Sequence, residues 1–289
     1  GTLKELTWVW QYFKKFEEFS RFFKRAVGFD MWGAQRLWAR RFVRKKSFTI
    51  VAPTGSGKTT FVLVASLYMA SRGGRVLLIF PTSALALQAY RRLLTYMEKV
   101  GKSVRVVAYH SMLTEREKRD ALEAVEGGNF DILIVTTAFL PKRFDLLARH
   151  KFGLVAADDV DSILRATSRN IDRVLKLLGV SEGVLNTALR AIDLVKQLRR
   201  AEVVGNLKEV ERLEGELERA REELRKAVGG LELGVFIASG ALAKARRTTR
   251  LLLFREILGF DIGGRAEGLR NVVDLYTEAE RDVARQTVE

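Results

Sequence analysis

The chain has 289 residues, 47% of them hydrophobic, which is enough to bury one large core or two small ones. No stretch approaches the roughly 18 consecutive apolar residues of a membrane span, and no signal-peptide pattern opens the sequence, so we expect a soluble, cytoplasmic protein without a membrane partner. Cysteine is absent and only two histidines are present. This composition excludes disulfides, a cysteine nucleophile and a zinc site built from the usual ligands, so any metal should have oxygen ligands.

The charge balance is strongly basic, with 50 Lys and Arg against 35 Asp and Glu and a net charge of +15. An excess of this size favours a nucleic-acid partner over an evenly solvated basic surface, and either of these over an anionic membrane. The absence of Cys, together with many Arg and Glu, also suits a protein from a hot organism.

Residues 1–27 are predicted to form an amphipathic helical extension of one or two helices. Apolar residues recur at near-helical spacing, with lysines and glutamates between them. Such a stripe can stack on bases but is more typical of a core, so we expect it to pack against the main domain. The stripe contains Leu6, Val9, Phe13, Phe16, Phe23 and Val27.

From Ser47 to His150 short apolar runs alternate with helical stretches, which is typical of a parallel sheet covered by helices on both faces. Two later runs, FGLVAADD and GVFIASG, add strands. Thr114 and Glu117 have the spacing of a capping box and indicate a helix start. The sequence therefore predicts an α/β fold.

Residues 179–230 interrupt this sheet. Ser181 can cap a first helix, Gly205-Asn206 can form a turn, and a second helix ends at Gly229-Gly230. We expect an inserted antiparallel helical hairpin, and its role is either contact with nucleic acid or a partner domain, or none. The seam of the second helix contains Val210, Leu213, Leu217, Ala220, Leu224 and Ala227.

The segment APTGSGKT, Ala52 to Thr59, follows an apolar strand and precedes a helix, the context required of a phosphate-binding loop. Gly55 and Gly57 let backbone N–H groups wrap around phosphates. Lys58 is expected to neutralise the β and γ phosphates of ATP, and the Thr59 hydroxyl to ligate Mg²⁺. Ala52, where the general form has Gly, is typical of helicases.

DDVD at Asp158 to Asp161 directly follows a predicted strand, so its carboxylates should emerge near the loop at the carboxyl end of the sheet. Asp158 is expected to orient Mg²⁺, and Asp159 to position or deprotonate the attacking water. Lys58, Asp158 and Asp159 are the predicted catalytic residues.

Upstream of the loop, the Gln35 amide can match the donor and acceptor edge of adenine, and Phe29 can cover the base. The predicted nucleotide-binding residues are Phe29, Gln35, Pro53, Thr54, Gly55, Ser56, Gly57, Lys58, Thr59 and Thr60.

These segments together resemble the helicase-like module of reverse gyrases, relatives of the superfamily-two (DEAD-box type) helicases, from about Gly28 to Tyr276. The resemblance is carried by QRLWARRF, VAPTGSGKTTF, FPTSALALQ, YHS, DILIVTT followed by FL, DDVD with SRNIDRVLKLLG, and LLFREILGFDIGG leading to RNVVDLY. DDVD, in place of the usual Asp-Glu-Ala-Asp, is the most discriminating of these.

The resemblance implies that Pro81-Thr82 and Thr136-Thr137 contact the nucleic-acid backbone, which agrees with polar strand ends meeting phosphates. It also implies that Ser239-Gly240-Ala241 couples hydrolysis to domain movement, although the family's threonine is replaced by alanine. Members generally begin with a Cys-ligated zinc finger, which this chain lacks, so we expect no zinc. We interpret the chain as a fragment or one subunit of a split enzyme.

The residue patterns and the resemblance together divide the chain into four parts. These are the extension 1–27, a RecA-like ATP-binding domain at 28–178 and 231–272, the hairpin 179–230, and 273–289 as a linker or the start of a second RecA-like domain. The leading hypothesis is the first RecA-like domain of an ATP-dependent topoisomerase that binds DNA and, with a second RecA-like domain and a topoisomerase domain, introduces positive supercoils. The alternatives are a motor domain of another superfamily-two DNA or RNA helicase, and a non-hydrolysing nucleotide-dependent nucleic-acid-binding module.

Overall fold

A computed structural model describes residues 2–50, 52, 55–160, 163, 169–239 and 249–260 of the chain. Its centre is a sheet of six strands in the order β1-β6-β5-β2-β4-β3, in which every neighbouring pair is parallel. The predicted parallel α/β sheet is therefore confirmed. The strands are β1 Phe48–Ile50, β2 Val76–Phe80, β3 Val106–Tyr109, β4 Ile132–Thr136, β5 Leu154–Asp158 and β6 Val235–Ser239.

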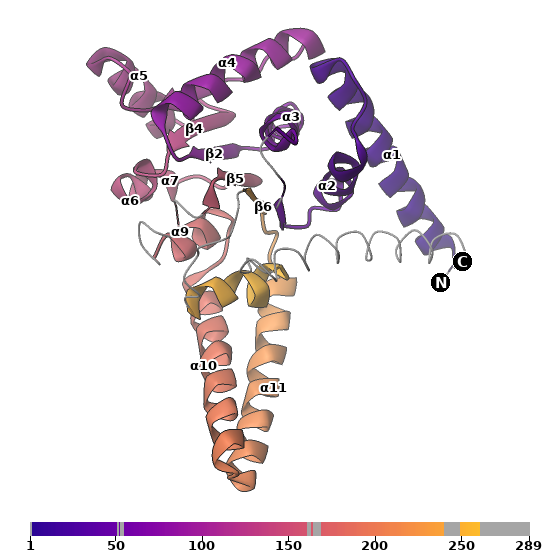
Figure 1. Cartoon of the computed structure of the whole chain (residues 1–289), viewed down its shortest axis with the longest axis vertical. Coiled ribbons are helices and arrows are strands. Elements are labelled where there is room, and N and C mark those ends of the chain that lie inside the picture. Colours follow the sequence, from indigo (N-terminus) through magenta and orange to yellow (C-terminus); the bar gives the residue numbers. More distant parts are fainter. Residues whose placement is uncertain are drawn as a thin grey trace.

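Helices cover both faces of the sheet (Figure 1). The first layer contains α1 Thr2–Val27, α2 Gly33–Val43, α3 Lys58–Ala70 and α4 Ser83–Val100. The second contains α5 Glu115–Glu126, α6 Phe139–Lys142, α7 Phe144–Leu147 and α9 Arg169–Leu177, and two short turns of 3-10 and π-helix, Thr249–Leu251 and Phe254–Leu258, pack on the same side. The predicted helical flanks are confirmed.

Alternation along the strands divides the core in two, because successive side chains of a strand point to opposite faces. In β2, Val76, Leu78 and Phe80 pack with the layer of α1 to α4. Leu77 and Ile79 pack with the other layer. All five side chains are buried, as expected for a parallel sheet covered on both sides.

The predicted inserted hairpin is also confirmed, as α10 Glu182–Val204 and α11 Leu207–Gly229, which project together from one end of the domain (Figure 1). Ser181 caps α10 by accepting a hydrogen bond from Val184 N, and Gly205 ends the helix with φ +75°. One seam position was wrong: Ala227 is exposed, and Val228 packs against the core instead. The role predicted for the hairpin stays a prediction.

The extension forms a single helix, α1, which packs on α2, α3 and α4. Phe19 and Phe23 are fully buried, and Phe19 meets the Tyr68 ring of α3 edge-on at 5.1 Å. Glu18 pairs with Arg72 at the end of α3. Phe13, which was expected in the packing stripe, is 49% exposed, because the buried stripe runs through Tyr12 one position earlier.

Among the residues that the structure describes, no helix is both long enough and apolar enough to span a membrane.

Two glycines provide a matched test of how tightly β6 packs against the rest of the sheet. A β-carbon on Gly234, at the entry to β6, would stand 2.2 Å from the carbonyl oxygen of Phe152, whereas one on Gly215 in α11 would meet nothing within 4 Å. Gly234→Ala should therefore lower the free energy of unfolding by about 3 kcal/mol. Gly215→Ala should raise it by about 0.5–1 kcal/mol, because alanine favours a helix. Chemical denaturation measures both, and equal effects of the two substitutions would contradict the packing of β6.

Candidate nucleotide site and strand-end edge

The carboxyl ends of all six strands lie at one edge of the sheet, because the strands are parallel. Across three neighbouring strands the register aligns Asp158 of β5 with Ser239 of β6, and Ser239 with Ile50 of β1. The phosphate loop follows β1 and the acidic segment follows β5. The structure thus brings these two predicted halves of the site to the same place, separated by one strand.

The loop has the backbone conformation that its glycines predict. Gly55 and Gly57 have φ of +80° and +78°, a left-handed region that side chains disfavour. α3 begins at Lys58, so its N-terminal N–H groups open onto the loop. The Ser56 hydroxyl is buried and has no hydrogen-bond partner among the residues that the structure describes. A buried donor left unpaired is costly, so the loop fits a phosphate oxygen that would accept from it.

Lys58 reaches back across this loop. Its Nζ donates to the carbonyl oxygen of Ala52 at 2.6 Å. Burial lowers the pKa of Lys58, and the nearby negative charge of Asp158 acts in the opposite direction. A phosphate group beside Nζ would act in the same direction as Asp158 and favour the charged amine.

Asp158 is held at the end of β5 by the neighbouring strand. The Ser239 hydroxyl donates to Asp158 Oδ1 at 2.7 Å, and Ser239 is only 2% exposed. This bond fixes one carboxylate oxygen and leaves the other, Oδ2, for a further ligand. Carboxylate and hydroxyl oxygens suit Mg²⁺, so Asp158 with Thr59 at the start of α3 supplies the donor types that such an ion requires.

Asp159 has φ +54°, one of two non-glycine residues with positive φ among those that the structure describes. Aspartate tolerates this left-handed conformation better than most residues, yet it remains uncommon and is enriched at functional positions. The turn it makes directs the chain out of β5 at the carboxyl edge.

Thr60, which is predicted to bind nucleotide, also contacts helix α4. Its Oγ1 accepts a hydrogen bond from Arg92 of α4 at 2.5 Å, and the same guanidinium donates to Tyr96 Oη at 2.9 Å. Sequence analysis did not identify Arg92, because nothing in the sequence pairs position 92 with position 60.

Gln35 lies against the loop. It is 2% exposed, its Nε2 donates to Gly57 O at 3.4 Å, and its Oε1 accepts from Trp32 N at 3.3 Å. Phe29 is 60% exposed. Trp32 is a nearer aromatic that the sequence analysis missed: it is 48% exposed, and its indole nitrogen lies 3.8 Å from where a β-carbon on Gly57 would stand.

The other half of the edge follows β2, β4 and β3. Thr82 is exposed and caps α4 by accepting from Leu85 N at 3.3 Å. Pro81 and Thr136 are half-buried. Thr137 is buried and its N–H donates to Phe80 O at 2.9 Å, so it links the ends of β4 and β2.

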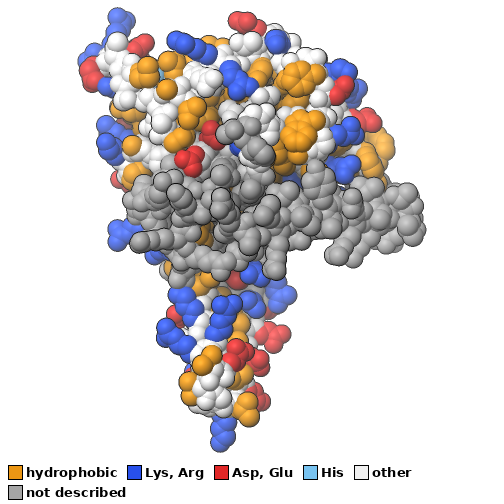
Figure 2. Space-filling view, viewed as in Figure 1, with side chains coloured by type: hydrophobic (Ala, Val, Ile, Leu, Met, Phe, Trp, Pro, Cys, Tyr) orange, Lys and Arg blue, Asp and Glu red, His pale blue; other side chains and the backbone are white. Residues whose placement is uncertain are grey.

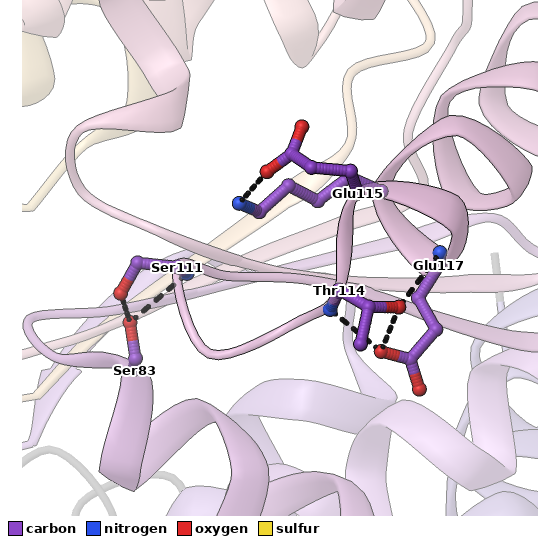
Figure 3. A network of polar contacts seen from close by, with 6 residues as sticks. Ser83, Ser111, Thr114, Glu115 and Glu117 are labelled. Carbon is purple, nitrogen blue, oxygen red and sulfur yellow. Dashed lines mark hydrogen bonds and ion pairs between the residues drawn. The ribbon is translucent and has the colours of Figure 1, made fainter.

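A polar network continues this half of the edge (Figure 3). The Ser83 and Ser111 hydroxyls are 2.8 Å apart and join the start of α4 to the end of β3. The predicted capping box is confirmed, since Glu117 N donates to Thr114 Oγ1 and Thr114 N donates to Glu117 Oε2. Burial lowers the pKa of His110, against the opposing effect of the Glu117 carboxylate, and so favours the neutral ring.

Four of the predicted site residues, Pro53, Thr54, Gly240 and Ala241, lie outside the described residues, as do Asp161 and the segment 261–289.

The class of protein follows from the order of the strands and from the glycine-containing loop after the edge strand β1. It is a RecA-like α/β domain. The DEAD/DEAH box helicase family model matches residues 33–189, more than half of the sequence. The chain therefore belongs to the DEAD/DEAH box helicase family.

Within this family the chain is similar to reverse gyrases over almost its whole length, which confirms the predicted resemblance. It is 70% identical over 286 residues to the reverse gyrase of Pyrobaculum aerophilum, covering 99% of this chain and 23% of that protein. It is 40% identical to that of Pyrococcus horikoshii, covering 100% and 18%. The chain thus spans about a fifth of the length of these relatives. The solved structure of the helicase MrfA bound to DNA and AMPPNP is 17% identical, with a TM-score of 0.49 over 83% of this chain and 28% of that one.

The two exposed aromatics beside the loop can be separated by substitution. Because Trp32 is nearer to Gly57, Trp32→Ala should weaken ATP binding about tenfold through loss of a stacking surface. Phe29→Ala should change it less than about twofold. Titration with a fluorescent ATP analogue measures both, and a larger effect of Phe29→Ala would return the adenine-covering role to Phe29.

Proposed function

We propose that this chain is the ATP-binding first RecA-like domain of a reverse-gyrase-type motor, a nucleotide-dependent switch that binds DNA. The observation that best supports the proposal is the Ser239–Asp158 hydrogen bond beside the phosphate loop. It pairs a metal-orienting carboxylate with the serine of the segment predicted to couple hydrolysis to movement. With a second RecA-like domain and a topoisomerase domain, the switch would introduce positive supercoils into DNA.

The residues have separate tasks in this proposal. Gln35 and Trp32 place the adenine, and loop N–H groups with Ser56 and Lys58 hold the phosphates. Thr59 and Asp158 hold Mg²⁺, which when bound neutralises phosphate charge. Asp159 accepts the proton of the attacking water or orients it. Closure of a second RecA-like domain over this open edge would complete the site and change the affinity for DNA.

DNA is proposed to cross the other half of the edge, where Thr82, Thr136 and the serine pair Ser83 and Ser111 present hydroxyls. Backbone phosphates accept hydrogen bonds from such groups and from helix N-termini. ATP and DNA would then bind at the same edge of the sheet, but at the ends of different strands.

Two alternative functions can be distinguished from this proposal by experiment. Another superfamily-two helicase or translocase would unwind or move along nucleic acid without introducing positive supercoils, which a supercoiling assay on the full-length protein distinguishes. A non-hydrolysing binding module would show no ATP turnover with or without DNA.

Lys58→Ala removes the amine that the loop holds for the β and γ phosphates. We expect ATP affinity to fall at least about tenfold, because a charge-assisted contact contributes roughly 1.5–3 kcal/mol. Calorimetric titration of ATP measures the loss, with Lys102→Ala, an exposed lysine before β3, as control. Unchanged affinity would remove the phosphate role of Lys58.

Asp159→Asn separates binding from hydrolysis. Asparagine accepts the positive φ of this position, so the fold and ATP affinity should be retained. In the full-length protein, ATP turnover should fall about 10²–10⁴-fold, because the general base is lost, and positive supercoiling should stop with it. Normal turnover in a folded Asp159→Asn protein would eliminate the catalytic role.

A further inference from the structure

Positive charge is concentrated at the start of the chain. Residues 2–46 contain twelve Lys and Arg against four Asp and Glu, a net charge of +8 out of +15 for all 289 residues. Two of the four carboxylates are already paired, Glu18 with Arg72 and Asp30 with Lys24. Figure 2 shows blue and orange side chains interleaved over the region of α1 and α2.

A row of arginines on α2 and at its C-terminal cap, Arg44, lies along the aromatic residues of α1. The guanidinium carbons of Arg36 and Arg40 are 5.9 and 5.8 Å from the centre of the Phe16 ring, and that of Arg44 is 4.5 Å from the Tyr12 ring. In the part of the chain described, neither Arg36 nor Arg40 has an ion-pair partner. Two like charges four residues apart repel each other on a helix, so this pair favours an anion beside it.

Exposed aromatic rings continue this surface around α1. Trp10 is 62% exposed and Phe13 49% exposed, and Lys14 Nζ lies 5.0 Å from the centre of the Trp10 ring. Each step of three residues along an α-helix falls about 60° short of a full turn. Phe13 therefore lies between Phe16, beneath the arginines, and Trp10. We call the surface formed by Arg36, Arg40, Arg44, Phe13, Trp10 and Lys14 the α1–α2 face.

We propose that the α1–α2 face binds single-stranded DNA, with the arginines on backbone phosphates and unpaired bases stacked on Phe13 and Trp10. Guanidiniums that follow a backbone beside exposed rings are the combination that binds single strands without sequence preference. Duplex DNA would use the arginines but offers the rings no unstacked base. The proposal rests on the proposed DNA-binding function and adds a second contact surface, separate from the strand-end edge.

The test compares matched variants of the whole chain without nucleotide, by fluorescence anisotropy of a labelled oligo-dT strand over a range of salt concentrations. Arg36→Gln with Arg40→Gln should reduce the slope of log affinity against log salt by about 1.4, since each phosphate contact to a single strand contributes about 0.7. Arg36→Lys with Arg40→Lys keeps the charge and should keep the slope. The control is Lys102→Gln with Arg149→Gln, exposed residues before β3 and β5, and it should match the unmodified chain.

Base stacking on the exposed aromatic rings is tested separately. Trp10→Ala with Phe13→Ala removes only exposed rings, so the protein should melt at nearly the unmodified temperature. Its affinity for oligo-dT should fall roughly tenfold or more at unchanged salt slope, while its affinity for a duplex should stay within about twofold.

The outcomes separate this inference from the proposed function. If the unmodified chain binds DNA and the glutamine variant behaves like its control, the α1–α2 face is excluded and the DNA-binding function stands. Equal losses for oligo-dT and duplex in the aromatic variant would exclude base stacking. Competition by polyglutamate as effective as by oligo-dT at equal charge would point to an acidic protein partner and overturn the proposal. A chain that binds no DNA in low salt contradicts the proposed function itself.

Discussion

Parallel pairing of all six strands is the constraint on which the candidate site depends. Because each strand runs in the same direction, every strand-to-helix turn falls at one edge. The phosphate loop, the acidic strand end and the hydroxyl-bearing turns are distant in sequence, from Ala52 to Ser239, yet they meet there. An antiparallel pair anywhere in β1, β6 and β5 would move one of these elements to the opposite edge.

The strand order then divides that edge. β6 separates the loop strand from the carboxylate strand, and Ser239 fills the space between them by donating to Asp158. β2, β4 and β3 lie beyond β5, so the turns predicted to contact nucleic acid are side by side and begin where the nucleotide half ends. The Thr137 to Phe80 hydrogen bonds across β2 and β4 hold these turns together.

Much of this arrangement was predictable because it rests on local chemistry. The glycines of the loop, the Ser181 and Thr114 caps and the apolar runs of the strands act within a few residues of themselves. The spacing of apolar residues correctly predicted the hairpin seam as far as Leu224. The prediction was wrong at Ala227, because at this end of α11 the contacts pass from α10 to the body of the domain. Exposure on α1 was not predictable either. The more apolar ring of Phe13 is exposed, whereas the phenol ring of Tyr12 is buried and has the Arg44 guanidinium 4.5 Å from its centre.

Contacts between segments distant in sequence could not be predicted either, because they depend on how the helices pack. Neither Arg92 with Thr60 nor Trp32 beside Gly57 has a local signature, and both depend on how α2 and α4 pack against α3. Gln35 was identified from its position upstream of the loop, but its hydrogen bond to Gly57 O became visible only in the structure. A β-carbon on Gly57 would lie 2.6 Å from Gln35 Nε2, so a larger residue there would have to displace the Gln35 amide as well as adopt a positive φ.

The loop and its helix are thus held from two sides, by Gln35 of α2 at Gly57 and by Arg92 of α4 at Thr60. α4 begins at the Thr82 cap on the strand-end edge, and α2 carries Arg36 and Arg40 of the α1–α2 face. A rearrangement of the loop around phosphates must either break these two hydrogen bonds or move the helices that make them. Close-packed helices move as rigid units. Movement of α2 and α4 would therefore transmit a change at the nucleotide to both surfaces that are proposed to bind DNA.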